Sequence, residues 1–272
     1  MQLSLQHTLR TAIRLLAIAA VVFLIFGPLS SFVIWSFAEK WYWPNVWPQQ
    51  TGLFYWLKIA RSADLLRSLQ LGVVVAVLVT GMTLLTAVPL GYALARWRVP
   101  AKPVILMLFL LPQAFPQLPV FANTAVILYR FDLGATVPGV VLIHMVGALV
   151  FAVWTMTAVF KSIPIELEEA AVNLGASRLR TFMGIALPLA MPGIIASALL
   201  VFLYSLDEFT GTLLVGAPFV VTLPVFMYNA AQGYELQVAS ITALLLMIPG
   251  VVLLLLMERY LKAEYLAMFG RV

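Results

Sequence analysis

The sequence predicts an all-α membrane protein with six transmembrane helices. Hydrophobic residues make up 63% of the 272 residues and charged residues only 10%, and the mean hydropathy is +1.04. This composition offers too little polar surface to cover a soluble globule of that size. A helix spans the bilayer with about 20 apolar residues. Six runs meet this requirement: 14–37, 68–95, 103–129, 138–160, 189–213 and 238–258.

The first run is interpreted as a membrane helix that is retained. Arg10 and Arg14 lie before and at the start of the apolar stretch, as cations do in a secretory signal peptide. The run is longer than the roughly 7 to 15 apolar residues of such a peptide, and residues 37–40 offer no small-x-small cleavage site.

The Lys and Arg residues predict the orientation. Eleven of the sixteen fall at the two ends of the chain and in the second and fourth loops: Arg10, Arg14, Arg96, Arg98, Lys102, Lys161, Arg178, Arg180, Arg259, Lys262 and Arg271. The other three loops hold Lys40, Lys58, Arg61, Arg67 and Arg130. Because cations are enriched on the cytoplasmic side, both termini are predicted to be cytoplasmic. The cations sit at helix ends rather than in a stripe, so no nucleic-acid partner is predicted.

The outer loop 38–66 is rich in aromatic residues and proline. They are Trp41, Tyr42, Trp43, Pro44, Trp47, Pro48, Phe54, Tyr55 and Trp56. Amphipathic rings favour the lipid headgroup layer, which predicts an interfacial belt with a short surface helix from Phe54 to Ile59. Alternatively, some of these rings contact an extracytoplasmic protein, since aromatic residues are enriched in binding hot spots.

The third run is interrupted by Pro112, Pro116 and Pro119, each of which removes a backbone donor. Non-helical backbone inside a membrane is tolerated where protein or a water-filled cavity satisfies it. The polar side chains among these prolines are Gln113, Gln117 and Asn123. We expect this span to border the translocation path, the alternative being a kink that only serves packing.

A second interruption follows the fifth run. Residues 211–237 contain a short amphipathic stretch, Leu223 to Ala230, which is too short to cross and predicts a re-entrant or interfacial helix.

The loop between the fourth and fifth runs has the most informative pattern of helix starts and ends in the sequence. Pro164 suits the start of a helix, and the acids that follow it interact favourably with the helix dipole. Gly175 fits the left-handed position that ends a helix, and Ser177 can cap the next one. Ala170 and Ala171 are small enough for a partner's backbone to approach closely. We call residues 164–188 the docking loop.

The docking loop resembles, position for position, the loop with which permeases of bacterial ATP-binding-cassette importers bind their ATPase. The residues that carry the resemblance, and for which it implies ATPase coupling, are Glu168, Glu169, Ala170, Ala171, Gly175, Ile185, Leu187 and Pro188. The resemblance, to permeases of the methionine and maltose importer type, covers residues 65–260 and implies the type I importer fold with a cytoplasmic coupling helix. Residues 1–64 then form an additional N-terminal helix with the aromatic outer loop, and 261–272 a cytoplasmic tail.

The resemblance also implies partners and a location. They are an ATPase dimer that holds ATP and Mg, a second permease subunit in a heterodimer, and an extracytoplasmic solute-binding protein, in the lipid of the bacterial inner membrane. Within the family, the sequence resembles the second permease of spermidine/putrescine importers. The residues that carry this likeness are Ser205 to Glu208, Gly216 to Pro218, Thr222 to Pro224 and Leu187 to Pro192.

Polar residues near the end of the fifth run are candidates for the substrate path. Asp207 and Glu208 need water or a partner at this depth, because a carboxylate in hydrocarbon is costly. One expectation is that the two acids line a cavity for a cationic solute, with Tyr204 and Ser205 beside them. The alternative is that they only mark the outer end of the helix. His144, with no carboxylate nearby in sequence, is interpreted as a hydrogen-bonded packing residue rather than a proton relay.

The leading hypothesis is therefore a permease for a polyamine, with 2-aminoethylphosphonate, an opine or ferric iron as alternative solutes. An ion-driven secondary transporter is the alternative class, but no inverted repeat of the proline-rich span is found. The sequence contains no Cys, no phosphate-binding loop of the Gly-x4-Gly-Lys type and no paired intramembrane catalytic groups. No catalytic residue, metal or cofactor is expected in this chain.

Overall fold

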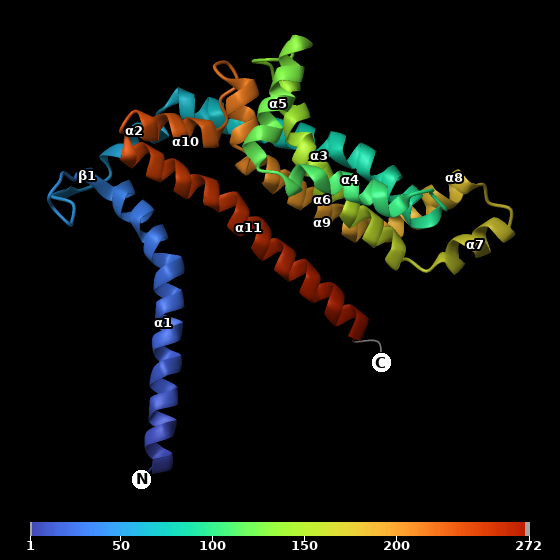
Figure 1. Cartoon of the computed structure of the whole chain (residues 1–272), viewed down its shortest axis with the longest axis horizontal. Coiled ribbons are helices and arrows are strands. Elements are labelled where there is room, and N and C mark those ends of the chain that lie inside the picture. The colour runs from blue at the N-terminus through green and yellow to red at the C-terminus, as the bar shows by residue number, and fades with distance from the viewer. Residues whose placement is uncertain (1, 270–272) are drawn as a thin grey trace. The chain divides into compact units, whose positions relative to one another are not determined.

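The computed structural model describes the backbone of residues 2–269 and the side chains of 10, 13–253 and 255. The elements in chain order are α1 (Gln2–Phe37), β1 (Ala38–Lys40), β2 (Gln50–Thr51), α2 (Phe54–Ala60), α3 (Ala63–Arg96), α4 (Lys102–Ala114), α5 (Gln117–Arg130), α6 (Val137–Ser162), α7 (Ile165–Asn173), α8 (Arg178–Thr181), the π-helical turn η1 (Phe182–Ala186), α9 (Leu187–Asp207), the π-helical turn η2 (Thr212–Gly216), α10 (Leu223–Gln232) and α11 (Leu236–Phe269). Figure 1 labels most of them.

The chain divides into two compact units. One comprises Met1–Ala63 and Met227–Met247, and the other comprises Asp64–Phe226 and Ile248–Val272. The predicted segments 1–64, 65–260 and 261–272 are defined by function rather than by packing, and they stay a prediction. The side chains of the predicted tail lie outside the described residues.

The first unit contains α1 and a short antiparallel pair in which Ala38 of β1 lies opposite Thr51 of β2. The carboxylate of Glu39 accepts hydrogen bonds from the backbone N–H of Phe54 at 3.1 Å and from the side chain of Gln50 at 3.0 Å. Because the N-terminal N–H groups of a helix have no intrahelical acceptor, this carboxylate stabilises the start of α2. The short helix predicted over 54–59 is thereby confirmed.

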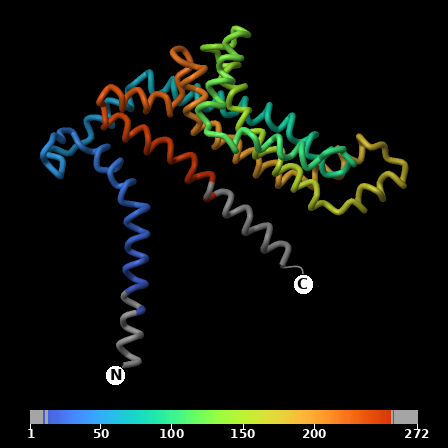
Figure 2. Tube along the Cα trace, viewed as in Figure 1, coloured from blue at the N-terminus to red at the C-terminus, as the bar shows by residue number. Residues whose placement is uncertain are grey.

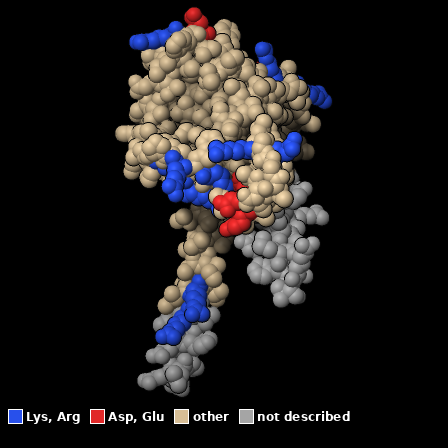
Figure 3. All heavy atoms as spheres, turned by 90° about the vertical axis from the view of Figure 1, so that its right-hand side faces the viewer, with Lys and Arg blue, Asp and Glu red and all other residues tan. Residues whose placement is uncertain are grey.

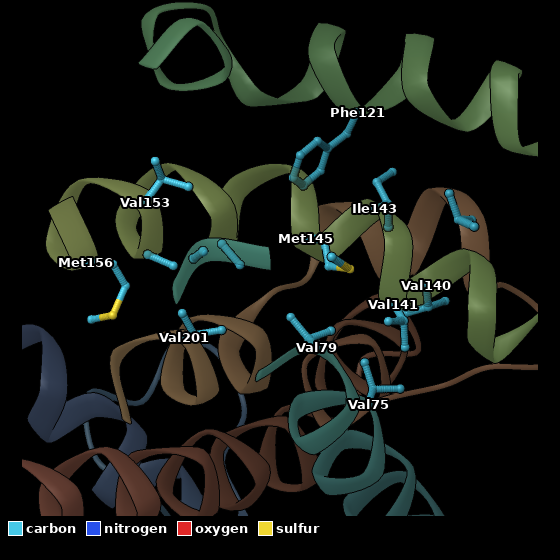
Figure 4. Packing of buried hydrophobic residues seen from close by; sticks show 14 of the residues in the cluster. Val75, Val79, Phe121, Val140, Val141, Ile143, Met145, Val153, Met156 and Val201 are labelled. Carbon is cyan, nitrogen blue, oxygen red and sulfur yellow. The ribbon is translucent and has the colours of Figure 1, made fainter. Parts of the chain in front are cut away.

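The second unit is built around α6, which packs against α4, α5 and α9 (Figure 1). More than half of its membrane-length apolar window, 61%, is buried, against 33% for α3. Figure 4 shows how side chains from four helices meet there, with Val75 and Val79 from α3, Phe121 from α5, Val201 from α9 and a series from α6. A helix that is apolar on all sides is buried by its neighbours, so α6 forms the central support of this unit.

The predicted third span consists of two helices rather than one. Helices α4 and α5 meet at an angle of 102°. Pro116 is the residue that precedes α5, and Phe115 before it is extended, with φ −104° and ψ 155°. A proline pushes the preceding residue out of the helical region, which explains why the helix stops here, whereas Pro112 lies inside α4.

The other predicted spans agree with the structure apart from their ends. Within the described residues, five helices are long and apolar enough to cross a membrane, or up to six if α4 and α5 form one broken span. The fifth helix is shifted relative to the predicted 189–213, because it runs from Arg178 to Asp207 as one helix through α8, η1 and α9. The short helix expected from Leu223 to Ala230 is α10. The fold class is confirmed, and the side of the membrane on which the termini lie stays a prediction.

Candidate functional site

The docking loop forms a helical hairpin at one end of the second unit. Helix α7 follows Pro164 and carries Glu166 and Glu168 in its first turn, where negative charge is favourable to the helix dipole. The trace in Figure 2 shows α7 and α8 projecting beyond the ends of α6 and α9. The loop is thus a distinct protrusion built on two membrane helices.

Gly175 makes the corner of this hairpin. Its φ is +90°, a conformation that side chains with a Cβ disfavour. The N–H of Gly175 donates to the carbonyl of Val172 at 2.9 Å, and the N–H of Ala176 donates to the carbonyl of Ala171 at 3.0 Å. These bonds satisfy carbonyls at the end of α7, so the predicted left-handed helix end at Gly175 is confirmed.

The second half of the hairpin begins at Ser177. Its hydroxyl accepts a hydrogen bond from the N–H of Arg180 at 3.3 Å, as predicted for a helix cap. The widened turn η1 ends two residues before Pro188. A proline ring inside a helix clashes with the carbonyl four residues earlier, here that of Gly184, and a wider turn relieves this crowding. Ile185 and Leu187 are half-buried at this junction, while Pro188 is exposed.

The outward face of the hairpin is a mixture of charged and apolar side chains. Glu169 and Ala170 are exposed, and Ala171 is half-buried. Leu174, in the turn, is 90% exposed. Figure 3, which views the molecule from this side, shows cationic and anionic side chains gathered at this end, while most of the other visible surface carries neither. This face is accessible to a partner protein.

Glu168 differs from this exposed face, because its side chain is buried within the second unit. One carboxylate oxygen accepts from the Nε of Arg96 at 2.7 Å, and the other accepts from the hydroxyl of Tyr92 at 2.6 Å. The guanidinium also donates to the carbonyl of Ile163 at 2.9 Å. The sequence predicted Glu168 as one of the ATPase-coupling residues, whose acids would pair with a basic groove. In the structure its charge is already paired inside the chain.

The partners of Glu168 were not found from the sequence. Arg96 was interpreted only as a cytoplasmic cation, and Tyr92 was not singled out. The ring of Tyr92 packs against Phe160 of α6 and Phe182 of η1, with ring centroids 5.3 and 4.7 Å away. These contacts connect α3, α6 and the hairpin at one point.

A second polar cluster, which we call the His144 network, lies inside the second unit. His144 is fully buried, and its ring nitrogens lie 2.9 Å from the hydroxyl of Ser205 and 2.8 Å from that of Thr212. The carboxylate of Glu208 lies 3.2 Å from the same ring. His144 is thus the hydrogen-bonded packing residue that was expected, although a carboxylate does lie beside it in space.

Glu208 is buried and has its hydrogen-bonding capacity filled. It accepts from the N–H groups of Gly211 at 2.9 Å and Thr212 at 3.2 Å, and from the side chain of Gln117 at 3.1 Å. This carboxylate caps the helical turn after α9. Glu208 therefore does not offer the unpaired negative charge that was expected from the sequence. Asp207, in contrast, is exposed.

Three of the candidate path residues lie together around one pocket. The pocket has a volume of about 290 Å³ and is lined by Pro112, Gln113, Phe115, Gln117, Phe121, Gly147, Phe151 and Tyr204. Close packing of the Tyr204 hydroxyl against Gly147 depends on the missing side chain, because a Cβ there would clash with it. We call this the Tyr204 pocket.

The other candidate path residues lie elsewhere. Asn123 is exposed and donates to the carbonyl of Pro119 in its own helix at 2.8 Å. Ser205 belongs to the His144 network. Among the described residues, no group of three or more His, Cys, Asp or Glu side chains could hold a metal ion.

Comparison with known proteins identifies the family. A family model described as "Binding-protein-dependent transport system inner membrane component" matches residues 87–265, which include the whole docking loop. The chain belongs to this family. It is accordingly a multi-pass permease of an ATP-binding-cassette importer, and thus a transport subunit.

Individual relatives support the same class. A putative ABC transporter permease protein, ORF1 of Streptomyces antibioticus, is 33% identical over 71% of this chain and 85% of its own length. The trehalose transport system permease protein SugB of Mycobacterium tuberculosis is 30% identical over 74% of both chains. The fold is similar to that of a bacterial transporter involved in the import of the acidic polysaccharide alginate, with a TM-score of 0.73, 17% identity and coverage of 94% of this chain and 97% of the other. The expected closeness to polyamine permeases finds no support in these relatives.

The two acids at the end of α9 should differ in their effect on stability. Replacing Glu208 with Ala leaves the N–H groups of Gly211 and Thr212 without their acceptor and costs about 1–3 kcal/mol. Glu208→Gln keeps a carbonyl acceptor and should cost less. The measurement is the thermal unfolding midpoint of the detergent-purified transporter. Asp207→Ala is the matched control and should leave the midpoint nearly unchanged; equal losses for both acids would contradict the assigned role of Glu208.

Proposed function

We propose that this permease forms half of the translocation path for a carbohydrate in an ATP-driven importer. In this proposal a second permease completes the path as a heterodimer, a solute-binding protein delivers the carbohydrate, and an ATPase dimer with ATP and Mg supplies the energy. The observation that carries the assignment as an ATP-driven importer is the docking loop. It is a protruding hairpin with an exposed acid, small residues and a left-handed corner at Gly175.

The hairpin has the properties that docking to another protein requires. A short helix gains little stability in water by itself. Helix α7, however, is held at its C-terminal end by backbone hydrogen bonds and near its N-terminal end by the partners of Glu168. A surface that is already ordered loses less conformational entropy on binding. Glu169 then offers an exposed charge, and Ala170 permits close backbone approach.

The Tyr204 pocket supports a neutral, hydroxyl-rich solute. Its lining combines four aromatic rings with the amides of Gln113 and Gln117, and no charged side chain of the described residues lines it. Amide and phenol groups exchange hydrogen bonds with hydroxyls, and rings supply the apolar surface typical of ligand pockets. The nearest buried carboxylate, Glu208, is already paired, and the exposed Asp207 is not among the residues that line the pocket. The likeness to a trehalose permease supports the same class of solute.

The docking role is tested by changing the exposed acid and the corner. We expect Glu169→Lys and Gly175→Val to insert in the membrane but to lower transport and reduce the amount of ATPase that copurifies. The lysine reverses the charge on the docking face, and valine at positive φ costs at least about 1–2 kcal/mol, which distorts the corner.

The matched control for Gly175→Val is Gly81→Val in α3. A Cβ added at either glycine meets nothing within 4 Å, but only Gly175 has a positive φ. Gly81→Val should retain transport and ATPase binding. Wild-type transport and ATPase copurification in both docking variants would show that the docking assignment is wrong.

The solute is tested by uptake in cells that express the whole transporter. Labelled trehalose and maltose are compared with spermidine, 2-aminoethylphosphonate and ferric iron. We expect uptake of a carbohydrate, and we expect Gln113→Ala or Tyr204→Phe to weaken it about three- to tenfold, because each removes one hydrogen bond to the solute.

Gln70→Ala, which removes an exposed amide of α3 outside the pocket, is the control and should transport normally. Robust spermidine uptake with no carbohydrate uptake would contradict the proposed solute. It would leave the assignment as an importer permease intact.

A further inference from the structure

The structure joins the docking loop to a helix that is far away in sequence. Arg96 and Tyr92 lie at the end of α3, and they bind Glu168 of α7 across 72 and 76 residues of chain. By contrast, the loop is continuous with α6 on one side and with α9 on the other. Contact between the loop and α3 therefore depends on side chains.

The contact is strong for physical reasons. The side chains of Arg96 and Glu168 are each only 9% exposed, so solvent and salt screen their attraction weakly. Arg96 donates at the same time to Glu168 and to the carbonyl of Ile163, just before the loop begins. A guanidinium has a planar fork of donors that suits such a double contact, which an ammonium group cannot reproduce.

Aromatic packing fixes the position of Tyr92, the second partner of Glu168. The Tyr92 ring packs against Phe160 of α6 and Phe182 of η1, whose rings also contact each other. Its hydroxyl reaches the carboxylate oxygen of Glu168 that Arg96 does not bind. Both oxygens of the carboxylate are thus engaged by α3. Rotation of α7 relative to α3 would break both hydrogen bonds.

We propose that Arg96 is a positioning residue that fastens the docking loop to α3 through Glu168, so that ATPase-driven movement of the loop moves α3 together with α6 and α9. The inference rests on the proposed docking of the loop to an ATPase. It adds to that function a defined internal linkage, consisting of Arg96, Glu168 and Tyr92. Without this linkage, the ATPase would still bind Glu169 and the corner at Gly175, but its movement would reach α3 only weakly.

The test uses the complete transporter, reconstituted in proteoliposomes with its solute-binding protein. The measured quantities are ATPase copurification, ATP hydrolysis and solute transported per ATP. We expect Glu168→Gln and Arg96→Gln still to copurify with the ATPase, because Glu169 and the corner at Gly175 are unchanged, and still to hydrolyse ATP. Transport per ATP should fall at least about fivefold, the lower end of typical coupling between sites. Arg96→Lys should also be impaired, because it keeps the charge but loses the fork.

A crosslink separates coupling from simple structural damage. The chain has no native Cys, so Arg96→Cys with Glu168→Cys can be joined specifically by a short bis-maleimide, in Cys-free partner subunits. The uncrosslinked double variant should be uncoupled, and crosslinking should restore transport per ATP. Arg98→Gln, which removes an exposed cation two residues away, is the control and should behave as wild type.

The outcomes distinguish a failure of the linkage from a failure of the proposed function. Normal transport per ATP in Glu168→Gln and Arg96→Gln, with a functioning wild type, would overturn the linkage alone. Failure of the crosslink to restore coupling would also overturn it, because a mechanical connection would then be insufficient. A wild-type transporter that shows no ATP-driven transport would instead overturn the proposed function on which the linkage rests.

Discussion

The organisation of the end of the second unit that carries the docking loop depends on one buried carboxylate. Glu168 cannot remain charged away from water without partners, and the partners that it has, Arg96 and Tyr92, belong to a different helix. Pairing therefore forces α7 to lie against the end of α3. This arrangement leaves Glu169, the next residue, free on the exposed face. Two adjacent acids thus lie in different settings, one paired inside the chain and one on the exposed face that we propose binds the ATPase.

The need of a buried carboxylate for partners also determines the packing inside the second unit. Glu208 is buried, and it is satisfied by backbone N–H groups, by Gln117 and by the neighbourhood of His144. Its pairing connects the turn after α9 to α5 and α6, beside the Tyr204 pocket. Glu208 is not among the residues that line this pocket, and the described lining consists of neutral residues, mainly with rings and amides. This favours a hydroxyl-rich solute over the polyamine that a count of acids along α9 had suggested.

Local features were predictable from the sequence, and long-range pairings were not. The corner at Gly175, the Ser177 cap and the short helix α2 follow from residues a few positions apart, whose hydrogen bonds are set by local backbone geometry. The apolar runs likewise predicted the membrane helices. The pairs of Glu168 with Arg96 and of Glu208 with His144 join separate helices, so nothing in their spacing indicates them. The 102° bend before α5 was predictable only in part, because three prolines indicated where the helix is interrupted but not the angle of the bend.

We infer that the docking loop and α3 move as one body. It is tested most directly by the distance between spin labels at Arg98→Cys, just beyond α3, and Val172→Cys, on the exposed side of α7, measured in the assembled transporter without nucleotide and with ATP bound. We predict distance distributions with the same maximum and width in both states, and a broader distribution when Glu168→Gln is added. A shift of the maximum on ATP binding in the otherwise unchanged protein would contradict it.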